Sequence, residues 1–162
     1  MGFFITSPVF ASGQAIPARF ARDGENISPP LVWNGAPERT RSFILMLEDP
    51  IPAPPVRYWL AYDITVSHLP EGAGSNGSRG ALIRHGRNDF GRLGYDGPAP
   101  PPDETYHPFY FRLAALSVEQ LAVEAGAPAA LVWDAARRHV LEEAELIGIY
   151  TRTDLSANLG AA

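Results

Sequence analysis

The stretch "EDPIPAPPVRYWLAY" (Glu48–Tyr62) decides how this chain folds, because a proline-rich segment in it is followed at once by an aromatic, strand-like run. Its prolines are Pro50, Pro52, Pro54 and Pro55. Proline breaks helices and cannot donate a hydrogen bond to a sheet, so this segment is predicted to be a stiff loop between two strands. Such a loop either makes a short, stable turn or holds the carboxylate of Asp49 at a fixed place beside a pocket.

Strand-like segments flank this loop and recur along the chain. They are rich in aromatic and branched residues, are bounded by Pro, Gly, Asn or Asp, and comprise Phe3–Thr6, Ser42–Glu48, Tyr58–Ile64, Phe109–Leu116 and Leu146–Thr151. The segment Ser42–Glu48 is almost continuously apolar, which favours a central strand buried on both faces. In Phe109–Leu116 apolar and polar residues alternate, which is typical of a half-buried strand.

Helical patterns are confined to the last third of the chain. Ser117 and Gln120 fit a capping box that opens a short helix over 118–126. After Pro128, apolar residues recur at four-residue spacing, at Val132, Ala136, Val140 and Ala144. This spacing predicts an amphipathic helix over 129–146 that packs its apolar side on a sheet. The fold is therefore predicted to be mainly β, with C-terminal helices.

The composition limits the class of protein and its partners. A length of 162 residues fits a single domain, 1–162. A net charge of -5 argues against nucleic acid or an anionic membrane surface as the main partner. The first residues have no basic start and form too short an apolar run for a signal peptide or a membrane span, so we expect a cytoplasmic location without membrane insertion.

Most catalytic signatures are missing from the sequence. It has no cysteine, no lysine and no Gly-x-Ser-x-Gly elbow, which excludes thiol nucleophiles, phosphate-binding P-loops and the usual hydrolase nucleophile. The histidines are not at metal-ligand spacing: His68, His85, His107 and His139. We therefore expect no metal and no cofactor.

Two stiff loops remain as places for chemistry, one with Asp49 and the other ending at His107. A carboxylate near an imidazole favours its charged form and orients the ring, and such a pair binds an anion or moves a proton. The alternative is that Asp49 only closes a turn before Pro50 and that His107 only marks the entrance to a strand. Residue types alone leave both interpretations open.

Four blocks, read together, indicate a family. They are "DGENISPPLVW" (Asp23–Trp33), "EDP" (Glu48–Pro50), "GRNDFGRLGYDGPAPP" (Gly86–Pro101) and "HPFYFRLAAL" (His107–Leu116). The chain resembles the bacterial branch of the phosphatidylethanolamine-binding proteins, also called Raf-kinase-inhibitor-like proteins, over nearly its whole length. The resemblance implies a β-sandwich of two antiparallel sheets. It also implies a small pocket near one end of a sheet for phosphate-like anions or phospholipid head groups.

The resemblance assigns pocket positions in the first loop and the strand after it. Asp49 and Pro50 match the family's Asp-Pro-Asp motif, but Ile51 replaces the second acid. Tyr58 stands where the family has a pocket histidine.

Further pocket positions come from the later blocks. Gly97, Pro98 and His107 match the family, whereas Pro108 and Phe109 replace an arginine and a tyrosine. Losing polar partners disfavours a buried anion, and an apolar, aromatic wall suits an organic ligand. The expected ligand-binding residues are Asp49, Pro50, Ile51, Tyr58, Gly97, Pro98, His107 and Phe109.

Three functions are compatible with these residues. The first is a binding protein for a small organic or phosphorylated metabolite. The second is a cofactor-independent isomerase, cyclase or dehydratase, in which Asp49, Tyr58 and His107 form an acid–base set and Tyr58 donates a proton. The third is a kinase-inhibitor-like regulator, which the resemblance implies at family level only. A homodimer is expected from the resemblance to bacterial members.

Overall fold

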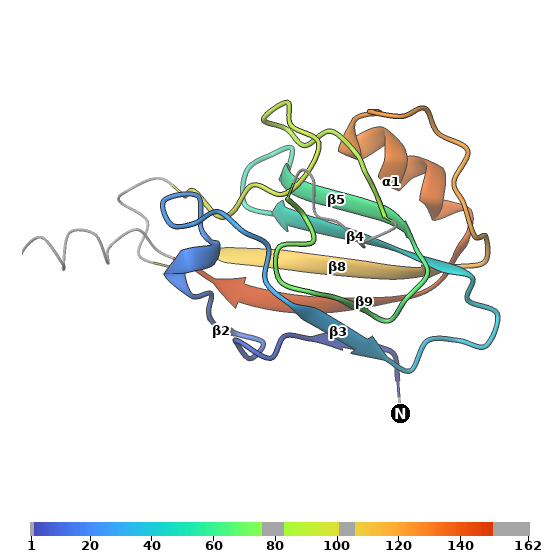
Figure 1. Ribbon diagram of the computed structural model, residues 1–162, viewed down its shortest axis with the longest axis horizontal. Coiled ribbons are helices and arrows are strands. Elements are labelled where there is room, and N and C mark those ends of the chain that lie inside the picture. Colours follow the sequence, from blue (N-terminus) through green and yellow to red (C-terminus); the bar gives the residue numbers. More distant parts are fainter. Residues whose placement is uncertain (1, 76–82, 101–105, 151–162) are drawn as a thin grey trace, which may run out of the picture.

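The computed structural model describes residues 2–75, 83–100 and 106–150, which form two facing β-sheets and one α-helix (Figure 1). The smaller sheet has the order β1-β3-β6, with β1 (Phe4–Thr6), β3 (Leu31–Asn34) and β6 (His68–Leu69). The larger sheet has the order β2-β9-β8-β4-β5-β7. Its strands are β2 (Gln14–Ala15), β9 (Val140–Ile149), β8 (Pro108–Leu116), β4 (Ser42–Asp49), β5 (Val56–Ile64) and β7 (Arg84–His85).

Strand β4 is the centre of the larger sheet. It pairs with β5 on one side and β8 on the other, and every one of its residues is buried. This confirms the prediction of a central strand from its continuous apolar sequence. Strand β8 alternates between buried and half-buried residues in its first half, as its sequence predicted.

The two faces of the larger sheet bury different cores. Odd-numbered β4 residues such as Phe43 face the smaller sheet, where the ring of Trp33 packs edge-on at 5.4 Å. Even-numbered residues such as Ile44 face the helix α1 (Ala129–Arg137), which contributes the buried side chains of Val132 and Ala136. Figure 1 shows α1 on this outer side, near β5 and β4.

The predicted short helix over 118–126 is wrong, because this segment has no helical residue. Its backbone groups bond to other elements instead. The amide of Leu121 donates to Oδ1 of Asp63 at 2.9 Å, and the hydroxyl of Ser42 donates to the carbonyl of Val118 at 2.6 Å. Tertiary hydrogen bonds thus satisfy backbone groups that would have paired within the predicted helix.

The predicted helix over 129–146 is right only for its first half. It ends at Arg137, and Val140–Ile149 forms β9, which begins six residues before the strand predicted at Leu146–Thr151, whose last residue lies outside the described ranges. Antiparallel pairing of β9 with β8 overrides the helical spacing. The described chain therefore has one α-helix rather than several. The pairing of β2 with β9 is parallel, so the larger sheet is antiparallel except at this edge.

Candidate functional site

The structure brings Asp49 and His107 into direct contact. Asp49 is the last residue of β4, and His107 immediately precedes the neighbouring β8. Since Glu48 lies opposite Tyr110 in the β4–β8 pairing, Asp49 and His107 reach the same end of the sheet. The distance from His107 Nε2 to Asp49 Oδ2 is 2.7 Å, and the two side chains are only 3% and 5% exposed. The pair lies on the face that packs toward the smaller sheet.

Asp49 also holds its own loop. Its second oxygen, Oδ1, accepts a hydrogen bond from the amide of Ile51 at 3.1 Å, which makes an Asx turn at the start of the proline-rich segment. Pro50 is half-buried in this turn, and Ile51 is 57% exposed, so its side chain lies at the surface. Turn formation and contact with His107 are therefore not alternatives, because one carboxylate does both.

A row of aromatic rings in mutual contact extends from His107 across the sheet. The His107 ring lies 5.0 Å from the ring of Phe109, which meets the ring of Tyr58 edge-on at 5.4 Å. Leu47 and Glu48 are adjacent in β4, but their partners in β5 are Trp59 and Arg57. Tyr58, which lies between these partners, is therefore an extra residue in a β-bulge. A β-bulge changes the direction of a side chain. Adjacent strand residues normally point to opposite faces, but the bulge lets Tyr58 and Trp59 pack in the same core.

Gly97 and Pro98 lie against the segment 20–26. The amide of Gly97 donates to Oδ1 of Asn26 at 2.7 Å, and the carbonyl of Pro98 accepts from the amide of Arg22 at 3.2 Å. A Cβ on Gly97 would lie 2.1 Å from the carbonyl oxygen of Phe20. Glycine is thus needed at position 97 because two backbone segments approach each other too closely for any side chain.

Two residues that the sequence analysis did not single out complete the aromatic end of the site. Phe90 packs on Tyr58 with ring centroids 5.0 Å apart. The guanidinium of Arg22 lies 3.9 Å from the centroid of Phe90 and 5.7 Å from that of Tyr58. Arg22 thus brings a positive charge to the site from a distant part of the chain. The signal available was its place directly before the "DGENISPP" block.

A buried carboxylate, Asp96, fixes the segments around this end. Its Oδ2 accepts from Nδ2 of Asn88 at 2.8 Å, and its Oδ1 accepts from Nδ2 of Asn26 at 3.3 Å. Nη1 of Arg92 lies 3.4 Å from Oδ1 and Nε of Arg22 lies 4.0 Å from it. The amide of Asp96 also donates to the carbonyl of Tyr58 at 3.1 Å. These bonds tie the blocks 22–26 and 88–97 to β5.

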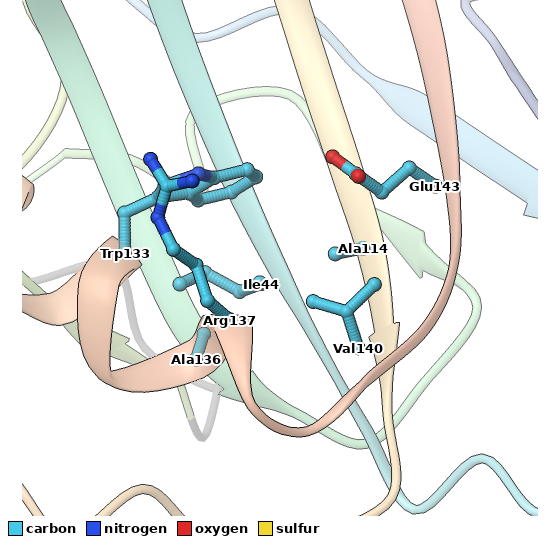
Figure 2. Close-up of a pocket in the computed structure, with 7 residues that line it drawn as sticks. All are labelled: Ile44, Ala114, Trp133, Ala136, Arg137, Val140 and Glu143. Atoms are coloured by element: carbon cyan, nitrogen blue, oxygen red, sulfur yellow. The ribbon is translucent and has the colours of Figure 1, made fainter.

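Cavities occur on the opposite face of the larger sheet. One of about 250 Å³ lies between α1 and β9, and Figure 2 shows Trp133 and Arg137 of α1 on one side of it and Glu143 of β9 on the other. A second, of about 280 Å³, adjoins it and reaches Arg112. The cations here already have acidic partners: Arg112 bonds to Glu48 and Glu145, and Arg137 bonds to Asp134. None of the predicted site residues lines these two cavities.

Two absences hold for the described ranges 2–75, 83–100 and 106–150. No group of three or more histidine and acidic side chains there is arranged to hold a metal ion. No helix within these ranges has the length and apolar character needed to span a bilayer.

Comparisons with known proteins agree with this architecture. The profile of the family described as phosphatidylethanolamine-binding protein matches residues 6–151. The crystal structure of Escherichia coli YbcL, described as a new member of the mammalian PEBP family, superposes with a TM-score of 0.87 at 30% identity, covering 93% of this chain and 99% of that one. This chain therefore belongs to the phosphatidylethanolamine-binding protein family.

Similar bacterial and archaeal proteins match over most of their length. A UPF0098 protein of Aquifex aeolicus is 37% identical over 158 residues, which cover 91% of this chain and 88% of that protein. A UPF0098 protein of Methanothermobacter thermautotrophicus is 41% identical over 140 residues, covering 85% and 91%. A homologue from Chlamydia trachomatis has a structure with a TM-score of 0.80 at 32% identity, covering 92% of this chain and 97% of that one.

Proposed function

We propose that this protein binds a small organic or phosphorylated metabolite at the end of the larger sheet, beside Asp49, Tyr58, His107 and Phe109. The observation that carries the proposal is the buried contact of 2.7 Å between His107 and Asp49 next to a row of aromatic rings. Burying two ionisable side chains costs free energy, so a paired carboxylate and imidazole at a loop junction favour a functional role. The family name, which refers to a phospholipid, supports a ligand with a polar head group.

The chemistry of the site favours a ligand with two unlike parts. The carboxylate of Asp49 fixes the orientation of the His107 ring, and such a pair offers both a donor and an acceptor to a polar group. The rings of Tyr58 and Phe109 give an apolar wall for a hydrocarbon or aromatic part. The replacements Ile51 and Phe109 make this site less polar than the family pattern implies.

The experiment is a titration with a panel of metabolites, followed by isothermal calorimetry of each compound that binds. We expect His107→Ala to weaken binding by about tenfold or more, the usual cost of losing a hydrogen bond to a charged group. His68→Ala is the matched control, because His68 is exposed on the short strand β6 of the smaller sheet. Equal affinities of the His107→Ala and wild-type proteins for every ligand would contradict the proposal.

The same contact supports a second candidate function, cofactor-independent proton transfer. An imidazole held by a carboxylate can accept a proton from a bound substrate, and a nearby phenol such as Tyr58 can donate one. Under this alternative, Tyr58→Phe would lower the turnover number of an identified substrate while leaving its binding within about threefold. Unchanged turnover in Asp49→Asn, Tyr58→Phe and His107→Ala would rule out this acid–base set.

A further inference from the structure

We propose that Arg22 forms an oxyanion subsite at the aromatic end of this site, so that the ligand is an aromatic or planar apolar molecule bearing a phosphate or carboxylate group. This inference rests on the proposed binding function and specifies its ligand. It assigns a role to a residue outside the positions that the family resemblance implied.

The position of Arg22 is fixed by stacking. Its guanidinium carbon lies 3.9 Å from the centroid of Phe90 and 5.7 Å from that of Tyr58, and the Tyr58 ring contacts Phe109 beside His107. Stacking on a ring occupies one face of a guanidinium and leaves the N–H groups at its edge directed outward in one plane. The side chain as a whole is 33% exposed, so it lies at the edge of the buried site, although two of its nitrogens are buried.

The hydrogen-bonding capacity of Arg22 is not used by the described part of the protein. Its Nε and Nη2 atoms are buried, and neither has a hydrogen-bond partner within the described ranges. The neighbouring acid is Asp96, whose Oδ1 lies 4.0 Å from Nε, beyond hydrogen-bond distance. Buried donors without acceptors are costly, so an arriving acceptor gains both an attraction and the relief of that cost.

The local charge balance also favours an anion. Asp96 is the acidic partner of two arginines, Arg22 and Arg92, and its two oxygens already accept hydrogen bonds from Asn88 and Asn26. Asp96 is therefore shared between two guanidinium groups, and its contact with Nε of Arg22, at 4.0 Å, is the longer of the two. Guanidinium binds phosphate and carboxylate through two parallel N–H···O bonds, and such charge-assisted bonds are about twice as strong as hydrogen bonds between neutral groups.

The rings define the rest of the ligand. Phe90 is 42% exposed, whereas Tyr58 and Phe109 are buried, so the aromatic row runs from the surface at Arg22 toward the Asp49–His107 pair. A planar body lying along these rings would carry its oxyanion to Arg22. Phenyl phosphate and benzoate are probes of this kind, and benzyl alcohol is a neutral probe of similar shape.

The test measures the affinities of these three probes by NMR titration, following the Arg22 Nε–H signal and the His107 ring signals. We expect Arg22→Gln to weaken the better-bound oxyanion probe by about tenfold or more, and to change benzyl alcohol by less than about twofold, because only the anion uses a charge-assisted bond. A preference for phenyl phosphate assigns a phosphate ligand, and a preference for benzoate assigns a carboxylate.

Two variants control the result. Arg92→Gln removes a charge from the same carboxylate, Asp96, but from a side chain that is 60% exposed, so we expect it to weaken oxyanion binding by less than about threefold. Arg22→Lys keeps the charge without the planar fork, and we expect an affinity between those of wild type and Arg22→Gln. It also keeps the test valid if Arg22→Gln does not fold.

The subsite is overturned if Arg22→Gln binds the oxyanions as tightly as wild type, if Arg92→Gln weakens them equally, or if no probe binds the wild-type protein at millimolar concentration. The proposed function fails differently. In that case oxyanion binding would shift the Arg22 signal but not the His107 signals, and His107→Ala would bind every probe and every metabolite as wild type does.

Discussion

His107 contacts Asp49 through Nε2 and Oδ2 at 2.7 Å because β4 and β8 are neighbours in the larger sheet and the two residues occupy adjoining ends of these strands. The sheet thus supplies the geometry, and the proline-rich segment after Asp49 supplies the rigidity. Both side chains are buried, so each supplies the other with a polar contact that water does not provide. This mutual dependence makes the contact testable by stability as well as by binding.

Removing the carboxylate should destabilise the fold. Asp49→Ala leaves the buried His107 without its acidic partner and the amide of Ile51 without its acceptor, so we expect a loss of about 2–4 kcal/mol in the free energy of unfolding. Asp49→Asn keeps the shape and one acceptor oxygen, and should cost about 1 kcal/mol. Urea denaturation measures both values.

The control for Asp49 is an exposed acid in an ion pair. Asp134 bonds to Arg137 with both side chains 69% exposed, and Asp134→Ala should cost less than about 1 kcal/mol. If Asp49→Ala and Asp134→Ala were equally stable, the contact with His107 would not contribute to the fold.

The ion pairs of Arg112, on the outer face of the larger sheet, should show how strongly burial changes the contribution of an ion pair to stability. Arg112 bonds through Nε to Glu48, whose side chain is 8% exposed, and through Nη1 to Glu145 at 2.7 Å, whose side chain is 36% exposed. Arg112→Met leaves the buried carboxylate of Glu48 without its cationic partner, so we expect the free energy of unfolding to fall by about 3 kcal/mol. Glu145→Gln should cost less than about 1 kcal/mol, since both side chains are partly exposed and water can bond to Arg112 in place of the lost carboxylate.

Thermal or urea unfolding of a double variant completes this test. Glu48→Leu in the Arg112→Met background removes the stranded charge, and should recover most of the lost stability. A double variant less stable than Arg112→Met alone would show that Glu48 has other favourable contacts that outweigh its burial cost.

The close approach at Gly97 leads to a prediction about the site itself. In Gly97→Ala the new methyl group would lie 2.1 Å from the carbonyl oxygen of Phe20, so the segment 20–26 must move. Because Arg22 is in that segment, we expect weaker oxyanion binding together with a loss of about 1–3 kcal/mol in stability. Gly2→Ala is the control, since nothing lies within 4 Å of its added Cβ. Unchanged binding and stability in Gly97→Ala would contradict the packing at this position.

The sequence predicted the central strands better than the C-terminal part, and the reason lies in side-chain spacing. Residues four positions apart share one face in a helix and also in a strand. The interval from Val132 to Ala136 is helical, and the interval from Val140 to Ala144 is extended in β9. The second interval is extended because β9 pairs with β8, and this pairing cannot be seen in the local spacing of apolar residues.

The site shows the same division between local and long-range information. Asp49 and His107 could be singled out because each sits where a stiff loop meets a strand. Arg22 and Phe90 were signalled only by their places beside and within the family blocks, because both lie outside regular strands and helices and meet only after the segments 20–26 and 88–97 pack together around Asp96. Their contact depends on the tertiary fold, which a local reading of residue types does not contain.

The last prediction concerns pH and a residue of β7. Burial lowers the pKa of His85 below its ordinary value, although backbone contacts with Leu60 and Ala73 oppose the shift. The indole Nε1 of Trp59 donates to Nδ1 of His85 at 3.3 Å, which requires the neutral ring. The folded state therefore resists protonation of His85 more strongly than the unfolded chain does.

This difference sets the direction of the pH effect. The stability gained from neutral His85 is complete above the unfolded pKa of about 6.5, and is lost as the pH falls through that value because the unfolded chain then binds more protons. We expect the free energy of unfolding to decrease from this group as the pH falls from about 7 to 5. His85→Asn keeps an acceptor for Trp59 but does not titrate, so this part of the pH dependence should disappear. His68→Asn, at an exposed position, should retain it, and a pH profile for His85→Asn identical to that of wild type would show that His85 does not carry the effect.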